Sequence, residues 1–501
     1  MTYRRRRPEE SLLYQAVSKR LSDFEAKLDD ESRRLPEFIY RELHAFLRCG
    51  DIEHGFARIY CRNCEHNRFV AFSCKKRGFC PACGGRRMAQ LAAHQVDSVL
   101  PAVPYRQWVL TFPFELHNYL SWKPRAMSDA LEVFVEALRY HYRQHCLPHA
   151  PSQAQLSSAS PTALKAHALR HPNDIGACTA IQRFNGALAL FPHFHTLVSD
   201  GLFLSSPSDD DEESTGDHIF IPADEPTEGE ITDVLIHFRH RLRRRFIARG
   251  YLKCDDEGEL SLNWRDSEGD DETRQQLRVY QASNRLRRAF GDGAGQKLLL
   301  NHGDQPPTPR FKGHFCVNYA GFGLHAATTI AADERDELER LCRYIHRPPI
   351  ARQRLTLTPD GRLYYAFRRP WSNGTEGIYF EGTEFIERLA ALIPPPYKNI
   401  VRYHGVFAPR SKLRSVIVGP ERQARLDSER EQRAAGRSLP TSMRWILWAE
   451  LMLRVFAEDV LCCPKCGSTM QNIAIIDQPE AIRSLLPYAS AEDDIQPRAP
   501  P

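Results

Sequence analysis

The stretch FPHFHTLVSDG, residues 191–201, decides how this chain of 501 residues arranges its chemistry. Two histidines stand on either side of Phe194, with apolar residues before and after them, and the pattern is typical of a β-strand. Residues two apart on a strand point to the same face, so His193 and His195 point together. A single histidine is usually a packing residue, whereas a pair on one face can hold a metal ion.

The composition is that of a globular chain, with 42% hydrophobic and 26% charged residues. No apolar run is long enough to cross a bilayer, and the basic start MTYRRRRPEESLLYQ is followed by no apolar segment of the kind that secretory signals carry. We therefore expect a cytoplasmic protein with no membrane partner. In that reducing compartment the 14 cysteines indicate metal rather than disulfides.

The pattern of elements predicts an α+β fold with an antiparallel sheet and flanking helices. Asn185-Gly186 is a hairpin signal directly before the histidine strand. The expected divisions are a helical segment at 1–48, a zinc ribbon at 49–95, a sheet domain at 96–350 with an acidic insert near 205–217, a basic DNA-binding region at 351–440, and a helix, cysteine knuckle and polar tail at 441–501.

Four cysteines in the second segment predict a zinc site. Fifteen residues separate the pair Cys61 and Cys64 from the pair Cys80 and Cys83, a spacing that fits a four-cysteine site of structural zinc. Cys74 lies between the pairs and is the alternative ligand; His66 and Cys49 are weaker substitutes.

A second, incomplete pair lies near the C-terminus. Cys463 and Cys466 form half of such a site, either as free thiols or as ligands of a zinc completed by a distant histidine or another subunit. Basic residues surround the first four cysteines, and six arginines occur in 237–250. Each basic group is compatible with a surface that contacts phosphates. The alternative is that the first group only surrounds a structural zinc site and that the second only forms the solvated face of a helix.

A family resemblance that covers residues from about 12 to 480 is carried by seven motifs, in one order: LRCGDIEHGFARIYC, FSCKKRGFCPACGGRRM, IQRFNGALALFPHFHTLVSDG, RLCRYIHRPPI, YYAFRRPWSNGT, IVRYHGVFAPRSKLR and DVLCCPKCG. Together they resemble the insertion-sequence-91 family of rolling-circle transposases. The resemblance implies an N-terminal zinc-binding domain followed by an HUH nuclease, named for its histidine-hydrophobic-histidine strand.

The resemblance also implies a reaction on single-stranded DNA, at transposon ends and target, and hence a protein associated with the nucleoid. His193 and His195 would hold Mg²⁺ or Mn²⁺ against a phosphate, and Tyr344 would attack it to give a 5′-phosphotyrosine. Some members carry a second tyrosine where this chain has Arg340. Arg343 and Arg347 flank Tyr344 and could bind the phosphate, and a homo-oligomer is compatible with this chemistry.

Several assignments stay open. The third metal ligand could be Gln182, His325, His346 or Asp200; a two-residue hairpin would hold Gln182 roughly 13 Å from His193 unless a bulge forms at Pro192. The rival nucleophiles are Tyr364, Tyr365 and Tyr403. The rival functions are a plasmid-type replication initiator or relaxase, and a zinc-ribbon DNA-binding protein whose nuclease has decayed.

Overall fold

The computed structural model describes residues 7–146, 175–205, 218–255, 257, 259–264, 269–302, 313–411, 413–417 and 459–490. The acidic insert, from residue 206 on, and the C-terminal helix expected at 442–461, up to residue 458, lie outside the described residues.

The centre of the molecule is a six-stranded sheet in which every neighbouring pair is antiparallel. Its strands, in spatial order, are β11 (Cys316–Tyr319), β12 (Phe322–Ile330), β3 (Tyr105–Thr111), β5 (Leu190–Ser199), β4 (Gly176–Phe184) and β16 (Val401–Gly405). The predicted α+β class with an antiparallel sheet is confirmed, and the histidine strand β5 is an interior strand.

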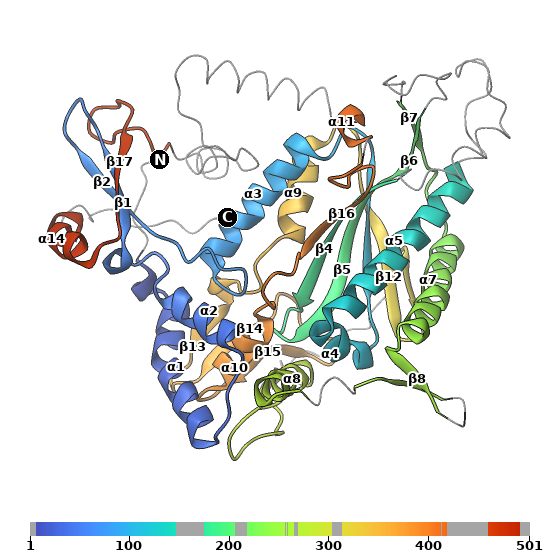
Figure 1. Cartoon of the computed structure of the whole chain (residues 1–501), viewed down its shortest axis with the longest axis horizontal. Helices are drawn as coiled ribbons and strands as arrows, with labels where there is room; N and C mark the ends of the chain where they lie inside the picture. Colours follow the sequence, from blue (N-terminus) through green and yellow to red (C-terminus); the bar gives the residue numbers. More distant parts are fainter. Residues whose placement is uncertain are drawn as a thin grey trace.

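Helices α4 (Phe114–Trp122), α5 (Pro124–Cys146) and α7 (Glu228–Ala248) cover one face of this sheet (Figure 1). Phe194 and Val198 of β5 point into that core with Trp108 and Leu110 of β3. The alternation follows directly from strand geometry, because successive side chains leave opposite faces.

Helices α3 (Pro81–Ser98) and α9 (Arg335–Ile345) run side by side over the other face (Figure 1). Leu197 belongs there to one buried hydrophobic cluster with Val96 of α3 and Leu338 of α9. His193 and His195 share the parity of Leu197, so they point toward these two helices rather than into the larger core.

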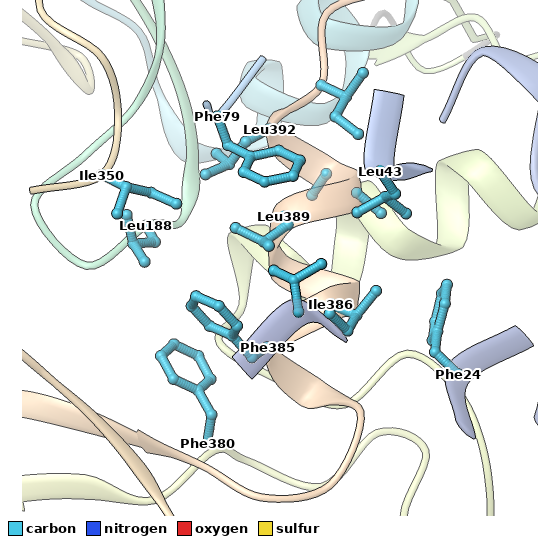
Figure 2. Close-up of a cluster of buried hydrophobic side chains, with 14 of the residues drawn as sticks. Phe24, Leu43, Phe79, Leu188, Ile350, Phe380, Phe385, Ile386, Leu389 and Leu392 are labelled. Carbon is cyan, nitrogen blue, oxygen red and sulfur yellow. The ribbon is translucent and has the colours of Figure 1, made fainter. Parts of the chain in front are cut away.

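A second core lies beside the sheet, formed by segments from both halves of the chain. Helix α10 (Glu384–Leu392) is buried on every side, and Figure 2 shows its Phe385, Ile386, Leu389 and Leu392 among aromatic and aliphatic neighbours. Its partners are α1 (Leu12–Asp30), α2 (Glu37–Leu47), α8 (Asp271–Asn284) and the sheet β10 (Leu300–His302), β15 (Thr375–Phe380), β14 (Leu363–Ala366), β13 (Leu355–Leu357).

The stretch expected as a basic DNA-binding region, 351–440, has its described part, up to residue 417, packed against other segments. Its first part completes the core of the N-terminal helices, and β16 adds the edge strand to the central sheet. The apolar residues of α10 need a buried partner, and α1 and α8 supply it.

A small three-stranded sheet joins the two ends of the chain. Strand β17 (Gln471–Ile476) pairs antiparallel with β1 (Phe56–Tyr60), which also pairs with β2 (Asn67–Ala71). Figure 1 shows the red β17 beside the blue β1, with α14 (Pro479–Ser490) next to them. Smaller elements are η1 (Pro8–Glu10), η2 (Ile52–His54), β6 (Gly201–Ser205), β7 (His218–Pro222), β8 (Leu252–Cys254), β9 (Leu260–Leu262), η5 (Arg352–Arg354) and α11 (Arg414–Ile417). None of the described helices is long and apolar enough to span a membrane.

Candidate functional site

The hairpin that carries the histidines is longer than the tight two-residue turn considered above. Asn185 and Ala189 close it, and the Asn185 side-chain oxygen accepts from the backbone N–H groups of Ala187 and Ala189. Phe184 pairs with Leu190 while Gln182 pairs with His193, so β5 has one extra residue between these pairs. This bulge, which contains Pro192, places Gln182 directly opposite His193 and removes the separation of roughly 13 Å.

The two histidines meet through one nitrogen each. Their Nε2 atoms lie 3.1 Å apart, and both side chains are buried. The Nδ1–H of His193 donates to the Phe191 carbonyl at 2.8 Å, which leaves its Nε2 as an acceptor. A backbone carbonyl that orients a ring in this way is typical of a histidine that ligates metal.

Both rings stay neutral near pH 7. Burial lowers the pKa of His193 to about 4, and burial together with the neighbouring charge of His193 holds the pKa of His195 well below its ordinary value. A neutral imidazole is the form that binds a metal ion.

Gln107 of β3 controls which proton His195 carries, and the sequence analysis did not single it out. Its amide Nε2 lies 3.0 Å from His195 Nδ1, and in this orientation the amide donates to Nδ1. When the amide nitrogen donates, His195 Nε2 is protonated and points to His193; when the amide oxygen faces Nδ1, both Nε2 atoms are free to ligate. The contact depends on the register of β3 and β5, in which Gln107 lies opposite Leu197, two residues from His195. This register is a tertiary feature that the sequence analysis did not predict.

Tyr344 lies over the histidine pair at the end of α9. Its ring is edge-on to that of His195, with centroids 6.1 Å apart, and its side chain is 41% exposed. The guanidinium of Arg347 lies 4.2 Å from the centre of the Tyr344 ring. A phenol that reaches solvent beside a cation is accessible to a phosphate.

The other two arginines of this helix are engaged by carboxylates. Arg343 donates to Glu339 at 2.6 Å, and Arg340 pairs with Glu337 at 2.6 Å. Arg347 has no carboxylate partner within the described part of the chain. Of the two arginines expected to bind phosphate, Arg347 is therefore the one with its charge uncompensated.

The four candidates for a third metal ligand differ in their hydrogen-bond partners and in their positions. Gln182 donates from Nε2 to the Ile345 carbonyl, and its buried Oε1 accepts no hydrogen bond from the described residues. His346 is bound to Gln95 at 2.9 Å. His325 lies across β3 from His195, and Asp200 is held by Arg106 and Tyr142 on the opposite side of the sheet.

The rival tyrosines lie elsewhere. Tyr365 is fully buried in the second core, and the Tyr364 hydroxyl accepts from Asn301 at 3.2 Å. Tyr403 is an edge-strand residue whose pKa burial raises well above the ordinary value. None of the three has a ring contact with the histidine pair among the described residues.

The expected zinc site built from Cys61, Cys64, Cys80 and Cys83 is wrong as a grouping. The structure separates its two halves, because Cys61 and Cys64 lie in the turn after β1 whereas Cys80 and Cys83 begin α3. Each pair instead joins two other cysteines in a four-sulfur cluster: Cys49, Cys74, Cys80 and Cys83 in one, and Cys61, Cys64, Cys463 and Cys466 in the other.

The geometry of both clusters suits zinc. In the first cluster Cys49 and Cys83 have sulfurs 3.6 Å apart, and in the second Cys64 and Cys463 have sulfurs 3.5 Å apart. Four sulfurs at ~2.3 Å from a zinc ion lie ~3.8 Å from one another. The C-terminal half-site is thus completed by the N-terminal pair of the same chain, rather than by a distant histidine or another subunit.

Much of the basic charge near the clusters is structural. Arg68 donates to the carbonyls of Val460 and Cys462, and Arg87 to those of Lys75 and Lys76. On α7, Arg245 pairs with three carboxylates of α5, whereas Arg243 and Arg244 remain exposed. The arginines of 237–250 are therefore in part ion-paired with α5 and in part exposed to solvent.

Two protein-family models match the chain. Residues 17–112 match a family described as "Transposase zinc-binding domain", and residues 176–414 match one described as "Putative transposase". No curated protein and no solved structure gives a significant match. The first match contains the cysteines of α3, and the second contains β4, β5 and α9.

These domains, with the paired histidines and the sulfur clusters, define a transposase, which is a nucleic-acid-processing enzyme with DNA as its partner. The chain belongs to the insertion-sequence-91 family of transposases, and its cysteines support structural zinc.

Proposed function

We propose that this transposase nicks and rejoins single-stranded DNA in rolling-circle transposition, through a 5′-phosphotyrosine formed on Tyr344. The observation that supports it is the position of Tyr344, exposed, beside His195 and under Arg347. The paired histidines would then be the metal side of the site and the phenol its nucleophile.

The donor set fits a divalent ion, Mg²⁺ or Mn²⁺. Nε2 of His193 and Nε2 of His195 converge, and Oε1 of Gln182 is a buried acceptor in need of a partner on the adjacent strand. Two nitrogens, one amide oxygen and open positions suit an octahedral ion. When bound, such an ion neutralises charge that develops on the phosphate.

The residues of the chain supply the remaining steps. The Tyr344 oxygen attacks phosphorus, the new O–P bond replaces the P–O3′ bond, and the 3′ oxygen takes a proton as the phenol loses one to water. Arg347 holds a non-bridging phosphate oxygen and stabilises its charge. When the Gln107 amide turns so that its oxygen accepts from His195 Nδ1–H, His195 Nε2 is unprotonated and can hold the ion.

Rejoining uses the energy stored in the phosphotyrosine. A 3′ hydroxyl attacks the same phosphorus and releases Tyr344, so no nucleotide triphosphate is consumed. Arg340, paired with Glu337, occupies the position one turn earlier on α9. One subunit therefore holds one covalent strand at a time, and a scheme with two bound strands requires a second subunit.

Zinc has a structural role in the same proposal, with one ion in each cluster. The Cys49, Cys74, Cys80 and Cys83 cluster anchors the start of α3, which lies against α9. The cluster that contains Cys463 and Cys466 ties the C-terminal strand to the N-terminal ribbon.

Tyr344→Phe tests the nucleophile. A labelled single-stranded oligonucleotide from each end of the mobile element is incubated with Mn²⁺, and the covalent adduct is resolved on a denaturing gel. The wild type should form an adduct on the peptide that contains Tyr344, and Tyr344→Phe should form none while it still binds DNA. Tyr319→Phe is the matched control, because Tyr319 is also 41% exposed.

His193→Ala and His195→Ala should abolish cleavage and leave binding largely intact, because backbone contacts supply most of the affinity. An adduct mapped to Tyr403 would refute the assignment of Tyr344. A wild type that gives no adduct with any divalent metal would favour a zinc-ribbon DNA-binding protein.

A further inference from the structure

A cavity of about 340 Å³ opens beside Tyr344. Its walls come from three separate parts of the fold: Tyr344 of α9, Gly186 of the β4–β5 turn, and the segment between β14 and β15. That segment contributes Phe367, Arg368, Arg369 and Trp371.

The aromatic wall is rigid. Phe367 and Trp371 stack with ring centroids 4.9 Å apart and an interplanar angle of 29°. The Phe367 N–H donates to the Glu376 carbonyl at 2.7 Å, and the Trp371 N–H to the Thr375 carbonyl at 2.8 Å. Backbone bonds on both sides therefore hold the two rings in place.

Core packing accounts for Phe367 but not for Trp371. Phe367 packs against the second core, whereas Trp371 belongs to none of the buried hydrophobic clusters of the described chain. A large aromatic ring kept at a cavity wall, outside a core, suits a planar ligand.

The charge of the cavity is positive. Arg368 and Arg369 are both exposed, and no ion pair joins either of them to a carboxylate in the part of the chain described. Arg347 does not line the cavity but is stacked on Tyr344, which does, and it is a third cation with no carboxylate partner among the described residues. Three guanidinium groups around aromatic rings fit an anionic strand whose bases can stack.

We propose that this cavity is a nucleotide subsite that holds one unpaired base of the DNA strand next to the phosphate attacked by Tyr344. The proposal rests on the function proposed above. Trp371 and Phe367 receive the face of the base, and Arg368 and Arg369 hold the phosphates on either side of it.

Size and position argue for a single strand. The volume lies at the small end of ligand pockets, ~300–1,000 Å³, which suits one nucleotide rather than a duplex. A base within a duplex is stacked and paired, and its entry would cost the energy of unstacking. The subsite therefore selects single-stranded DNA and sets the distance between one base and the cut.

The test measures binding where no covalent chemistry occurs. Full-length Tyr344→Phe and Tyr344→Phe/Trp371→Ala are titrated with single-stranded oligonucleotides in which one position at a time, around the cleavage site, is abasic. The Tyr344→Phe protein should bind about tenfold more weakly when one particular base is missing from the oligonucleotide. The same loss should have no further effect once Trp371 is absent, and 2-aminopurine at that position should be quenched only when Trp371 is present.

Control variants separate stacking from folding. Trp371→Phe should restore most of the affinity, and Tyr397→Ala, at a side chain 98% exposed, should leave the abasic effect unchanged. Arg368→Ala should weaken binding and reduce its salt dependence, whereas Arg285→Ala, at another exposed arginine, should do neither.

Equal abasic penalties with and without Trp371, at every position, would overturn the subsite. If the wild type still forms its adduct in that case, the proposed function survives without it. If the abasic penalty depends on Trp371 but no adduct ever forms, the subsite stands as a single-strand binding site and the nuclease proposal fails.

Discussion

At the residue scale, Asp200 shows how burial assigns a role. Its carboxylate accepts from Arg106 Nε at 3.1 Å and from the Tyr142 hydroxyl at 2.8 Å, on the side of the sheet away from the histidine pair. A buried charge that loses its partner is strongly destabilising. Asp200 is therefore a structural residue, although its place in the histidine motif made it a candidate ligand.

Asp200→Ala should lower the free energy of unfolding by about 3–5 kcal/mol, because Arg106 then remains buried and unpaired. Urea denaturation measures this change. The control Asp233→Ala, at an exposed position, should stay within about 0.5 kcal/mol of the wild type. A variant of normal stability that has lost Mn²⁺ binding would instead make Asp200 a ligand.

A buried histidine outside the site gives the fold a pH dependence. Burial, and then the charge of His145, lowers the pKa of His141 to about 4. The unfolded chain binds a proton at this position below a pH of about 6.5. The unfolded state therefore holds more protons between these values, and stability is lost as the pH falls from about 6.5 to about 4.

His141→Gln should reduce the slope of the unfolding free energy against pH, in this range, by up to about 1.4 kcal/mol per pH unit. Unfolding free energies at several pH values between neutrality and pH 4 provide the measurement, and His240→Gln, at an exposed histidine, is the control. Parallel curves for the wild type and His141→Gln would show that other groups cause the acid sensitivity.

At the element scale, α3 lies against α9, the helix that carries the proposed nucleophile Tyr344. A Cβ built on Gly84 in the first turns of α3 would lie 2.7 Å from the Cβ of Pro348, four residues after Tyr344, whereas a Cβ on Gly85 would meet nothing within 4 Å. The first cysteine cluster anchors this same end of α3. The cysteines that would hold zinc are thereby linked to the segment after Tyr344 by one close approach, between Gly84 and Pro348.

Gly84→Ala should push the end of α9 away from β5 and reduce adduct formation by about a hundredfold, because small misplacements of reacting groups are costly. Gly85→Ala should keep full activity and gain about 0.5–1 kcal/mol of stability from helix propensity. Rates of adduct formation and zinc content are measured for both variants. Equal rates would show that this contact does not position Tyr344.

At the scale of the whole molecule, the second cysteine cluster joins segments about four hundred residues apart. The two CxxC turns have the same backbone pattern, in which Cys61 N–H donates to the His66 carbonyl and Cys463 N–H to the Ser468 carbonyl, both at 2.9 Å. Hydrogen bonds from Ser468 and then Asn63 lower the pKa of Cys466 to about 5, which favours the thiolate that zinc needs.

Cys466→Ser should reduce the zinc content from two ions to one and expose the amides of β17 to hydrogen exchange, while the central sheet stays protected. Cys462→Ser is the control, because Cys462 is adjacent in sequence but outside the cluster. Metal analysis and hydrogen exchange provide the readouts. Two zinc ions in Cys466→Ser, with β17 still protected, would contradict the assigned ligands.

The sequence by itself determined the features that depend on local pattern. Alternation around His193 and His195 defines a strand with both rings on one face, and the periodicity of 335–345 defines the helix that ends beside Tyr344. CxxC turns are local as well, so their sulfur chemistry was readable without a fold. Each of these features needs only residues within about ten positions of one another.

Only the tertiary structure decided which local pieces meet. Spacing allowed Cys61 and Cys64 to share an ion with Cys80 and Cys83, but strand pairing brought them to Cys463 and Cys466. A bulge in β5 set Gln182 opposite His193. A local pattern is compatible with several such contacts. Long-range pairing and packing select one of them, because the free energy that favours one arrangement comes from burying distant segments against each other.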